Sequence, residues 1–102
     1  MMPQIRYDLY TRAFSIMLRV ERRRRRWKAI DLGKRVGVTG AGVSAWETAH
    51  CTPSFGNIVK IAEAFKVDLS DMMRAVENVA RVLEKQDADA AKSASSGEDP
   101  EG

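Results

Sequence analysis

Apolar residues recur at three- and four-residue spacing along most of the chain, whereas the alternation of a half-buried strand is absent. This periodicity is typical of helices that bury one face against a common core. The helical segments expected from it are about Ile5 to Arg24, Ala29 to Val36, Gly40 to Thr48, a stretch after Ser54 with core positions Ile58, Ile61, Ala62 and Phe65, and about Ser70 to Gln86. The pattern therefore predicts an all-α chain of five helices.

The first and last of these segments carry more apolar residues than one helix face can bury inside a small domain. In the first segment, Tyr7 and Tyr10 extend the apolar set toward the amino terminus. In the last segment, the surplus stripe contains Val76, Val79, Ala80 and Leu83. Two interpretations follow: the two helices pack on each other, or they form the interface of a homodimer. We expect a homodimer with the stripe of the last helix at its interface.

Turn and cap residues separate the helical segments. Gly37 suits a left-handed helix end, and Thr39 and Ser54 are expected to cap the helices that follow them. From Asp87 onward the chain has no large apolar residue. We expect residues 1–86 to form the folded domain and residues 87–102 to form a flexible acidic tail.

A chain of 102 residues, 44% of them hydrophobic, is large enough for one domain with a modest core. It contains no run of about 18 apolar residues that would span a membrane, and no secretory signal pattern. Its single cysteine, Cys51, excludes an internal disulfide and a zinc site built from cysteines. We therefore expect a cytoplasmic protein.

Charge is distributed unevenly between the two halves of the chain. Residues 1–51 hold eleven Lys and Arg against four Asp and Glu, whereas residues 52–102 hold six against ten. Five of the basic residues are the consecutive arginines of the segment 22–26. This asymmetry indicates that the first half faces a polyanion. A nucleic-acid phosphate backbone is the favoured polyanion, and an acidic protein or a membrane surface is the alternative.

The stretch WKAIDLGKRVGVTGAGVSAWETAHCTPSFGNIVKIAEAFKVDLSDMM resembles the lambda repressor/Cro type of helix-turn-helix domain, also called the xenobiotic response element family. The resemblance covers about residues 14–73. It rests on the framework residues Leu32, Gly37, Val38, Thr39, Val43, Ser44, Trp46, Glu47, Pro53, Ile61, Ala62 and Val67-Asp68-Leu69. It implies a five-helix lambda-repressor-like DNA-binding domain, here with extended first and last helices.

The resemblance also assigns roles to individual side chains. It implies a structural ion pair between Arg22 and Glu47, which ties the first helix to the recognition helix. It places four residues of the recognition helix at the base edges of DNA: Gly40, Ala41, Ser44 and Ala45. Members of the family usually carry long polar side chains at several of these positions.

Glycine and alanine cannot make bidentate hydrogen bonds to guanine or adenine. Three ways of reading DNA stay open: Ala41 or Ala45 contacts a thymine methyl, the small residues let the helix backbone sit deep in the groove, or DNA shape carries the specificity. A further interpretation is that the Gly40-Ala41-Gly42 segment only permits close packing against another helix or protein.

Contacts to the DNA backbone have more candidates. The expected residues are Arg23, Arg24, Arg25, Arg26, Lys28, Thr39, Thr48, His50 and Thr52. Three positions depart from the family pattern: Ala29 replaces a phosphate-binding glutamine, Gly33 replaces an alanine, and Ala49 replaces a common glycine. These departures put the glutamine contact and the loop after the recognition helix in doubt.

No residue pattern indicates catalysis. His50 has no carboxylate, hydroxyl or second metal ligand at a telling spacing, and Cys51 is a small loop residue. We expect no enzymatic activity, no cofactor and no metal site.

We therefore predict a small bacterial or phage transcriptional regulator that binds double-stranded DNA in a sequence-specific manner. It is expected to repress transcription by binding an inverted-repeat operator as a homodimer. The alternative is a protein-interaction module on a helix-turn-helix scaffold, such as an antitoxin or an adaptor with a protein partner.

Overall fold

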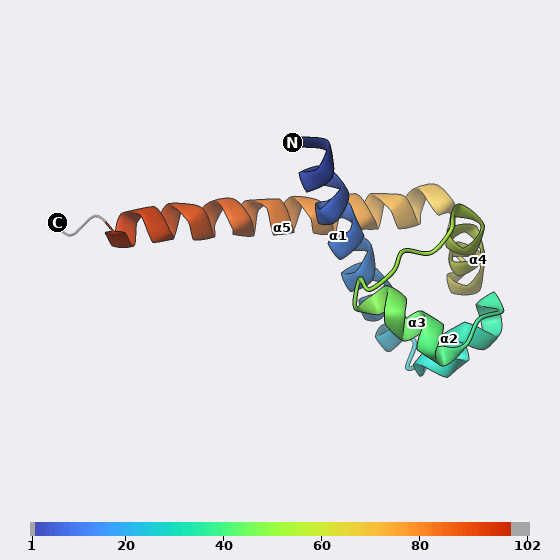
Figure 1. Cartoon of the computed structure of the whole chain (residues 1–102). Helices are drawn as coiled ribbons and strands as arrows, with labels where there is room; N and C mark the ends of the chain where they lie inside the picture. The colour runs from blue at the N-terminus through green and yellow to red at the C-terminus, as the bar shows by residue number, and fades with distance from the viewer. Residues whose placement is uncertain (1, 99–102) are drawn as a thin grey trace.

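The computed structural model describes the backbone of residues 2–98 and the side chains of residues 8–90, so that Tyr7 lies outside the described side chains. The helices are α1 (Met2–Arg24), α2 (Ala29–Val36), α3 (Gly40–Glu47), α4 (Phe55–Phe65) and α5 (Leu69–Glu98). Within residues 2–98 there is no strand. The predicted all-α, five-helix architecture with long first and last helices is confirmed. Figure 1 shows α2, α3 and α4 on one side of α5, which crosses α1 and projects beyond it.

Local sequence signals set the helix ends. The Thr39 hydroxyl accepts a hydrogen bond from the Gly42 amide at 3.0 Å, and the Ser54 hydroxyl accepts one from the Asn57 amide at 3.1 Å. Both caps satisfy an amide that has no partner within its helix. Gly37 ends α2 with φ 92°, a left-handed conformation that glycine adopts without steric cost.

The helix α5 continues to Glu98, whereas the sequence predicts an end near Gln86. The added segment contains four alanines, the residue with the highest helix propensity. It contains no proline, and the next proline in the chain is Pro100. Apolar periodicity fades after Leu83, but helix geometry needs only favourable local propensity once a helix is nucleated. The flexibility of the segment 87–102 stays a prediction.

All five helices contribute to the core, whose fully buried side chains include Leu18, Leu32, Val43 and Ile61. The stripe of α5 also belongs to it, because α5 packs against α1. Three of the residues expected at a dimer interface are buried within the chain: Val76, Ala80 and Leu83. Intramolecular packing of the first and last helices therefore covers most of the surplus apolar surface. Of the four expected residues, Val79 is half-buried.

Gly33 of α2 packs against the turn that leads into α3. A Cβ atom at this position would lie 2.5 Å from the Val38 carbonyl oxygen and 3.1 Å from the Thr39 carbonyl carbon. Both neighbours belong to the backbone of the turn, which cannot move aside without displacing α3. This contact explains why glycine replaces the alanine of the family pattern.

We predict that Gly33→Ala lowers the free energy of unfolding by about 1–3 kcal/mol, because overpacking outweighs the gain in helix propensity. Gly42→Ala is the matched control, since its added Cβ would meet nothing closer than 3.4 Å. Urea unfolding followed by circular dichroism measures both changes. Equal stability of the two variants would contradict the close contact at Gly33.

Candidate nucleic-acid interface

Arg22 connects three elements of the structure. Its Nη2 donates to Glu47 Oε1 at 2.8 Å, and its Nε donates to Glu47 Oε2 at 2.5 Å. Its Nη1 donates to the Trp27 carbonyl oxygen at 2.7 Å. The two paired side chains are only 12% and 7% exposed, and the hydrogen bond to Glu47 raises the pKa of the Arg22 guanidinium above its ordinary value. The end of α1, the α1–α2 segment and α3 are therefore fixed relative to each other.

This pairing is the one that the family resemblance implied. Arg19 adds a second link, since its Nη2 donates to the Glu47 carbonyl oxygen at 2.9 Å. Ser15, which is buried in α1, donates to the Trp46 carbonyl oxygen at 2.8 Å. The last turn of α3 is thus held by α1 through both backbone and side-chain atoms.

The outward face of α3 carries small side chains only. Ala41, Ser44 and Thr48 are exposed and Ala45 is half-buried, while Val43 and Trp46 point into the core. The Thr48 hydroxyl donates back to the Ser44 carbonyl oxygen at 3.1 Å, so that it lies along the helix. The face is consequently smooth, and a flat partner surface can approach the helix backbone closely.

The glycines of α3 face their own domain. A Cβ atom on Gly40 would lie 3.3 Å from both the Cα and the amide nitrogen of Ile30. A Cβ atom on Gly42 would lie 3.4 Å from Thr39 Oγ1. Gly40 therefore permits the close packing of α3 on the start of α2. This close packing is sufficient to explain why residue 40 is a glycine, and no contact between Gly40 and a base is needed to explain it.

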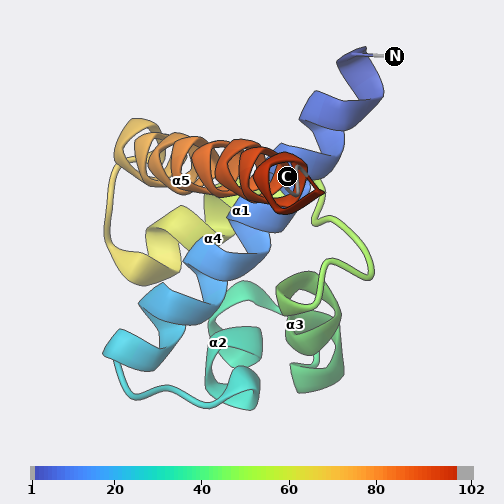
Figure 2. The same ribbon diagram turned by 90° about the vertical axis from the view of Figure 1, so that its left-hand side faces the viewer.

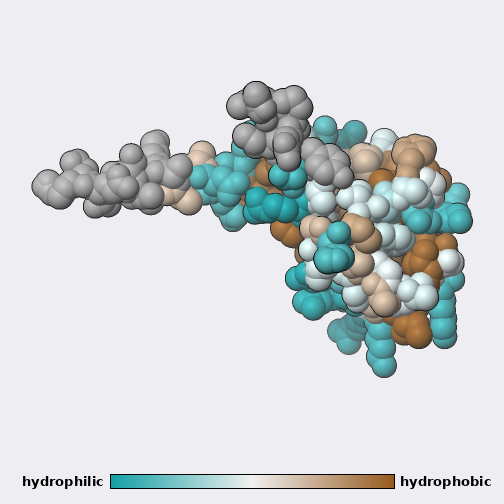
Figure 3. Space-filling model, viewed as in Figure 1, coloured by the Kyte–Doolittle hydropathy of each residue, from teal (hydrophilic) through white to brown (hydrophobic). Residues whose placement is uncertain are grey.

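Two helix starts share one end of the molecule. Figure 2 shows the α1–α2 segment together with the first turns of α2 and α3 at the end away from α5. The amide groups of a helix start give it partial positive charge, which attracts anions. On the face drawn in Figure 3, hydrophilic side chains project along this same lower edge.

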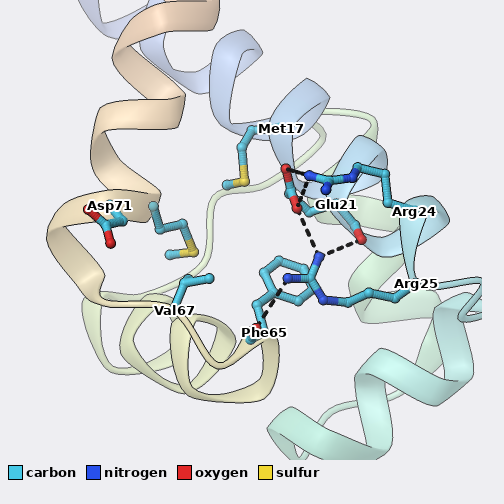
Figure 4. A pocket seen from close by; sticks show the side chains of 8 residues that line it. Met17, Glu21, Arg24, Arg25, Phe65, Val67 and Asp71 are labelled. Carbon is cyan, nitrogen blue, oxygen red and sulfur yellow. Dashed lines mark hydrogen bonds and ion pairs between the residues drawn. The ribbon is translucent and has the colours of Figure 1, made fainter.

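The five arginines do not act as one cluster. Arg25 donates to Glu21 Oε1 at 2.8 Å and to the Phe65 carbonyl oxygen at 3.1 Å, and its guanidinium lies 4.3 Å from the centre of the Phe65 ring. Arg24 donates to both carboxylate oxygens of Glu21 at 3.1 Å (Figure 4). Arg25 therefore joins α1 to the end of α4, and Glu21 partly neutralises both arginines.

Arg23 and Arg26 differ from their neighbours. Both are exposed, and neither side chain forms a hydrogen bond or ion pair with the residues whose side chains are described. Lys28 is exposed at the start of α2, where its amide donates to Asp31 Oδ2 at 2.8 Å. Of the arginine run and Lys28, these three side chains are free of internal partners among the described residues and can meet an external anion.

The remaining expected contact residues lie at both ends of α3. Thr39, Thr48, His50 and Thr52 are exposed, and the Thr39 hydroxyl is occupied by its cap. Ala49, which replaces a common glycine of the family pattern, adopts a left-handed conformation with φ 60°. Among the described residues, no three His, Cys, Asp or Glu side chains are grouped to hold a metal ion.

Sequence reasoning missed an aromatic and cationic stack beside this end. The Arg35 guanidinium lies 4.0 Å from the centre of the Trp27 ring, and Trp27 stacks on Phe65 with ring centres 5.9 Å apart. A tryptophan directly after an arginine run was the available signal. Arg35 is thereby held close to the α1–α2 segment.

We predict that Glu47→Gln lowers the free energy of unfolding by about 3 kcal/mol, because it leaves the buried Arg22 charge without its counterion. The matched control is Asp71→Asn, which removes one partner of the exposed Asp71–Arg74 pair. That change is expected to cost less than about 0.5 kcal/mol. Chemical denaturation of both variants gives the comparison, and a similar small loss in each would refute a central role for the buried pair.

Comparison with solved structures finds a similar arrangement of helices in another protein. Among solved structures, the crystal structure of the clp gene regulator ClgR from Corynebacterium glutamicum is similar, with a TM-score of 0.75 and 16% sequence identity. The match covers 80% of this chain and 87% of that chain, and at this identity it shows a shared fold. No curated protein sequence gives a significant match. No described helix is long and apolar enough to cross a membrane.

The family comparison covers the site itself. The family model described as helix-turn-helix matches residues 18–72, a segment that contains α2, α3, α4 and the Arg22–Glu47 pair. This match spans more than half of the chain. The chain therefore belongs to the Cro/C1-type helix-turn-helix family of DNA-binding domains.

Proposed function

We propose that this protein is a transcriptional repressor that occupies an inverted-repeat operator as a homodimer and acts without chemistry. One observation carries the proposal: the starts of α2 and α3 lie at one end, beside cations that have no partner among the described side chains. In a helix-turn-helix, the second helix enters the major groove while neighbouring elements hold the backbone. The same end of this molecule offers both parts.

Phosphate contacts are assigned to Arg23, Arg26 and Lys28. Their side chains can each pair with a phosphate without breaking an internal ion pair, whereas Arg25 would have to leave Glu21 and Phe65. Arg24 is mostly exposed but shares Glu21, so its contribution is smaller. The backbone contacts expected for all four arginines are therefore concentrated on two of them.

Base contacts are assigned to the outward face of α3. Ala41 offers a methyl group and Ser44 a hydroxyl, while the small side chains allow the helix to enter the groove deeply. Such a surface provides few hydrogen bonds to base edges. Two copies on one operator would supply the affinity that a single α3 lacks.

A gene-regulatory role is supported by the fold shared with ClgR, which is described as a clp gene regulator. Repression by occupancy fits a chain whose described residues form one helical body around one core. We place its action in the cytoplasm, where operator DNA is accessible. The smooth face of α3 also fits a protein surface, so an antitoxin or adaptor role is the second candidate.

The homodimer needs an uncovered apolar surface. On α5, Ala75, Val79 and Val82 follow at four- and three-residue spacing and form a strip beside the buried face. Val82 is 54% exposed, whereas Ala75 and Val79 are partly buried against the core. We assign the dimer contact to this strip, with Val79 as the member shared with the sequence prediction.

We predict that replacing Arg23 and Arg26 together by alanine weakens binding to every DNA sequence. The variant should also reduce the slope of log affinity against log salt by about four, because the dimer loses two phosphate contacts from each of its two subunits. Arg74→Ala with Arg81→Ala is the control, since it removes the same charge from α5. Fluorescence anisotropy over a salt series measures the slopes. If the control lowers the slope equally, net charge rather than contact explains the effect.

We predict that Val82→Lys converts the dimer into a monomer, because two lysines would face each other across the two-fold axis. Val20→Lys is the control, as Val20 is a similarly exposed valine on α1. Sedimentation velocity gives the masses. A monomeric parent protein would contradict the dimer itself, and an intact dimer in Val82→Lys would contradict the strip as its contact.

A further inference from the structure

Ile30 is an exposed apolar residue within the end of the molecule that is assigned to DNA. It is the second residue of α2 and is 51% exposed. The buried residues of α2 are Leu32, Gly33 and Val36, and Ile30 lies at the edge of the face that they form. Ile30 therefore contributes little to the core, and its position calls for an explanation at the surface.

The Ile30 side chain begins where the first side chain of α3 would stand. A Cβ atom built on Gly40 would lie 3.4 Å from the Ile30 Cβ and 3.3 Å from its Cα. In a helix-turn-helix, the first residues of the second helix are the ones that reach the base edges. Because Gly40 has no side chain, the start of α2 packs closely against it and brings Ile30 beside the start of α3.

The surroundings of Ile30 favour contact with nucleic acid. Lys28 is exposed two residues earlier, and the nearest carboxylate in the chain, Asp31, accepts the Lys28 amide and so bends back onto its own helix. A cation is left beside Ile30 to hold a phosphate. The isoleucine itself has no hydrogen-bonding group, so its partner on DNA must be apolar.

We propose that Ile30 is a specificity-determining residue that contacts the C5-methyl group of thymine in the major groove. This methyl is the apolar group that the base edges of unmodified DNA present there. The inference rests on the proposed DNA binding and assigns part of its sequence preference to α2. The operator should then carry an A·T pair at the position facing the start of α3.

The test separates the methyl group from the rest of the base. Full-length protein first enriches duplexes from a library with a randomised centre. One enriched duplex is then synthesised in two forms. One form carries thymidine, and the other carries deoxyuridine in its place, which lacks only the C5-methyl group. Binding of the parent, Ile30→Ala and Ile16→Ala proteins to both duplexes is measured by fluorescence anisotropy. Ile16 is the control because it is a partly exposed isoleucine on α1.

The expected result is a coupling between the side chain and the methyl group. The parent and Ile16→Ala should lose about fourfold in affinity for each half-site in which the thymine is exchanged for deoxyuridine, as for one buried methyl-sized group. Ile30→Ala should bind the thymine duplex more weakly and lose nothing further on the exchange. Alanine favours helix, so this variant is expected to fold, and circular dichroism verifies it.

Several results would overturn the inference. If Ile30→Ala still shows the full loss of affinity on exchange to deoxyuridine, Ile30 is not the residue that contacts the methyl group. If Ala41→Gly instead loses no affinity on this exchange, the methyl contact belongs to α3. Enriched binding that is insensitive to deoxyuridine leaves sequence-specific binding intact but excludes methyl contact. A library that yields no enriched duplex overturns the proposed function together with this inference.

Discussion

The Arg22–Glu47 pair is the constraint on which the geometry of the interface depends. A bidentate ion pair fixes both distance and orientation, and here it holds the last turn of α3 against the end of α1. The same guanidinium also holds the Trp27 carbonyl oxygen, and with it the segment that leads into α2. Because both charges are largely removed from water, neither can leave without a large cost. The relative positions of the starts of α2 and α3 therefore depend on one buried ion pair.

Close packing of α2 on α3 explains the glycines at positions 33 and 40 better than a loss of DNA binding does. Gly33 meets the backbone of the turn, and Gly40 meets the backbone at Ile30. The two helices approach more closely than alanine at either position would permit without adjustment. This packing removes side chains from the start of α3 but places a side chain of α2 beside it. The surface at this end of the molecule is accordingly formed by both helices.

The arginine run shows how one sequence motif divides into different physical roles. Arg22 is a buried structural group, Arg25 packs on Phe65, and Arg24 pairs with Glu21. Arg23 and Arg26 are left exposed. Consecutive residues on a helix point about 100° apart, which separates Arg22, Arg23 and Arg24 at the end of α1. Arg25 and Arg26 lie beyond the helix, where the chain turns and Arg26 adopts φ 61°. The net charge of the first half is therefore larger than the charge available to a partner.

The sequence by itself determined the positions of α2, α3 and α4, the end of α2 at Gly37 and the starts of α3 and α4, because cap hydroxyls, Gly37 and apolar spacing act locally. The framework residues also identified the family and its ion pair. Only the tertiary structure decided that Val76, Ala80 and Leu83 pack on α1, since apolar spacing does not name the partner that buries it. The tertiary structure alone showed that Arg23 and Arg26 are exposed whereas Arg25 is partly buried, and that Ile30 lies beside Gly40. These outcomes depend on contacts between segments far apart in the chain or on different helices, which residue spacing along one helix does not encode.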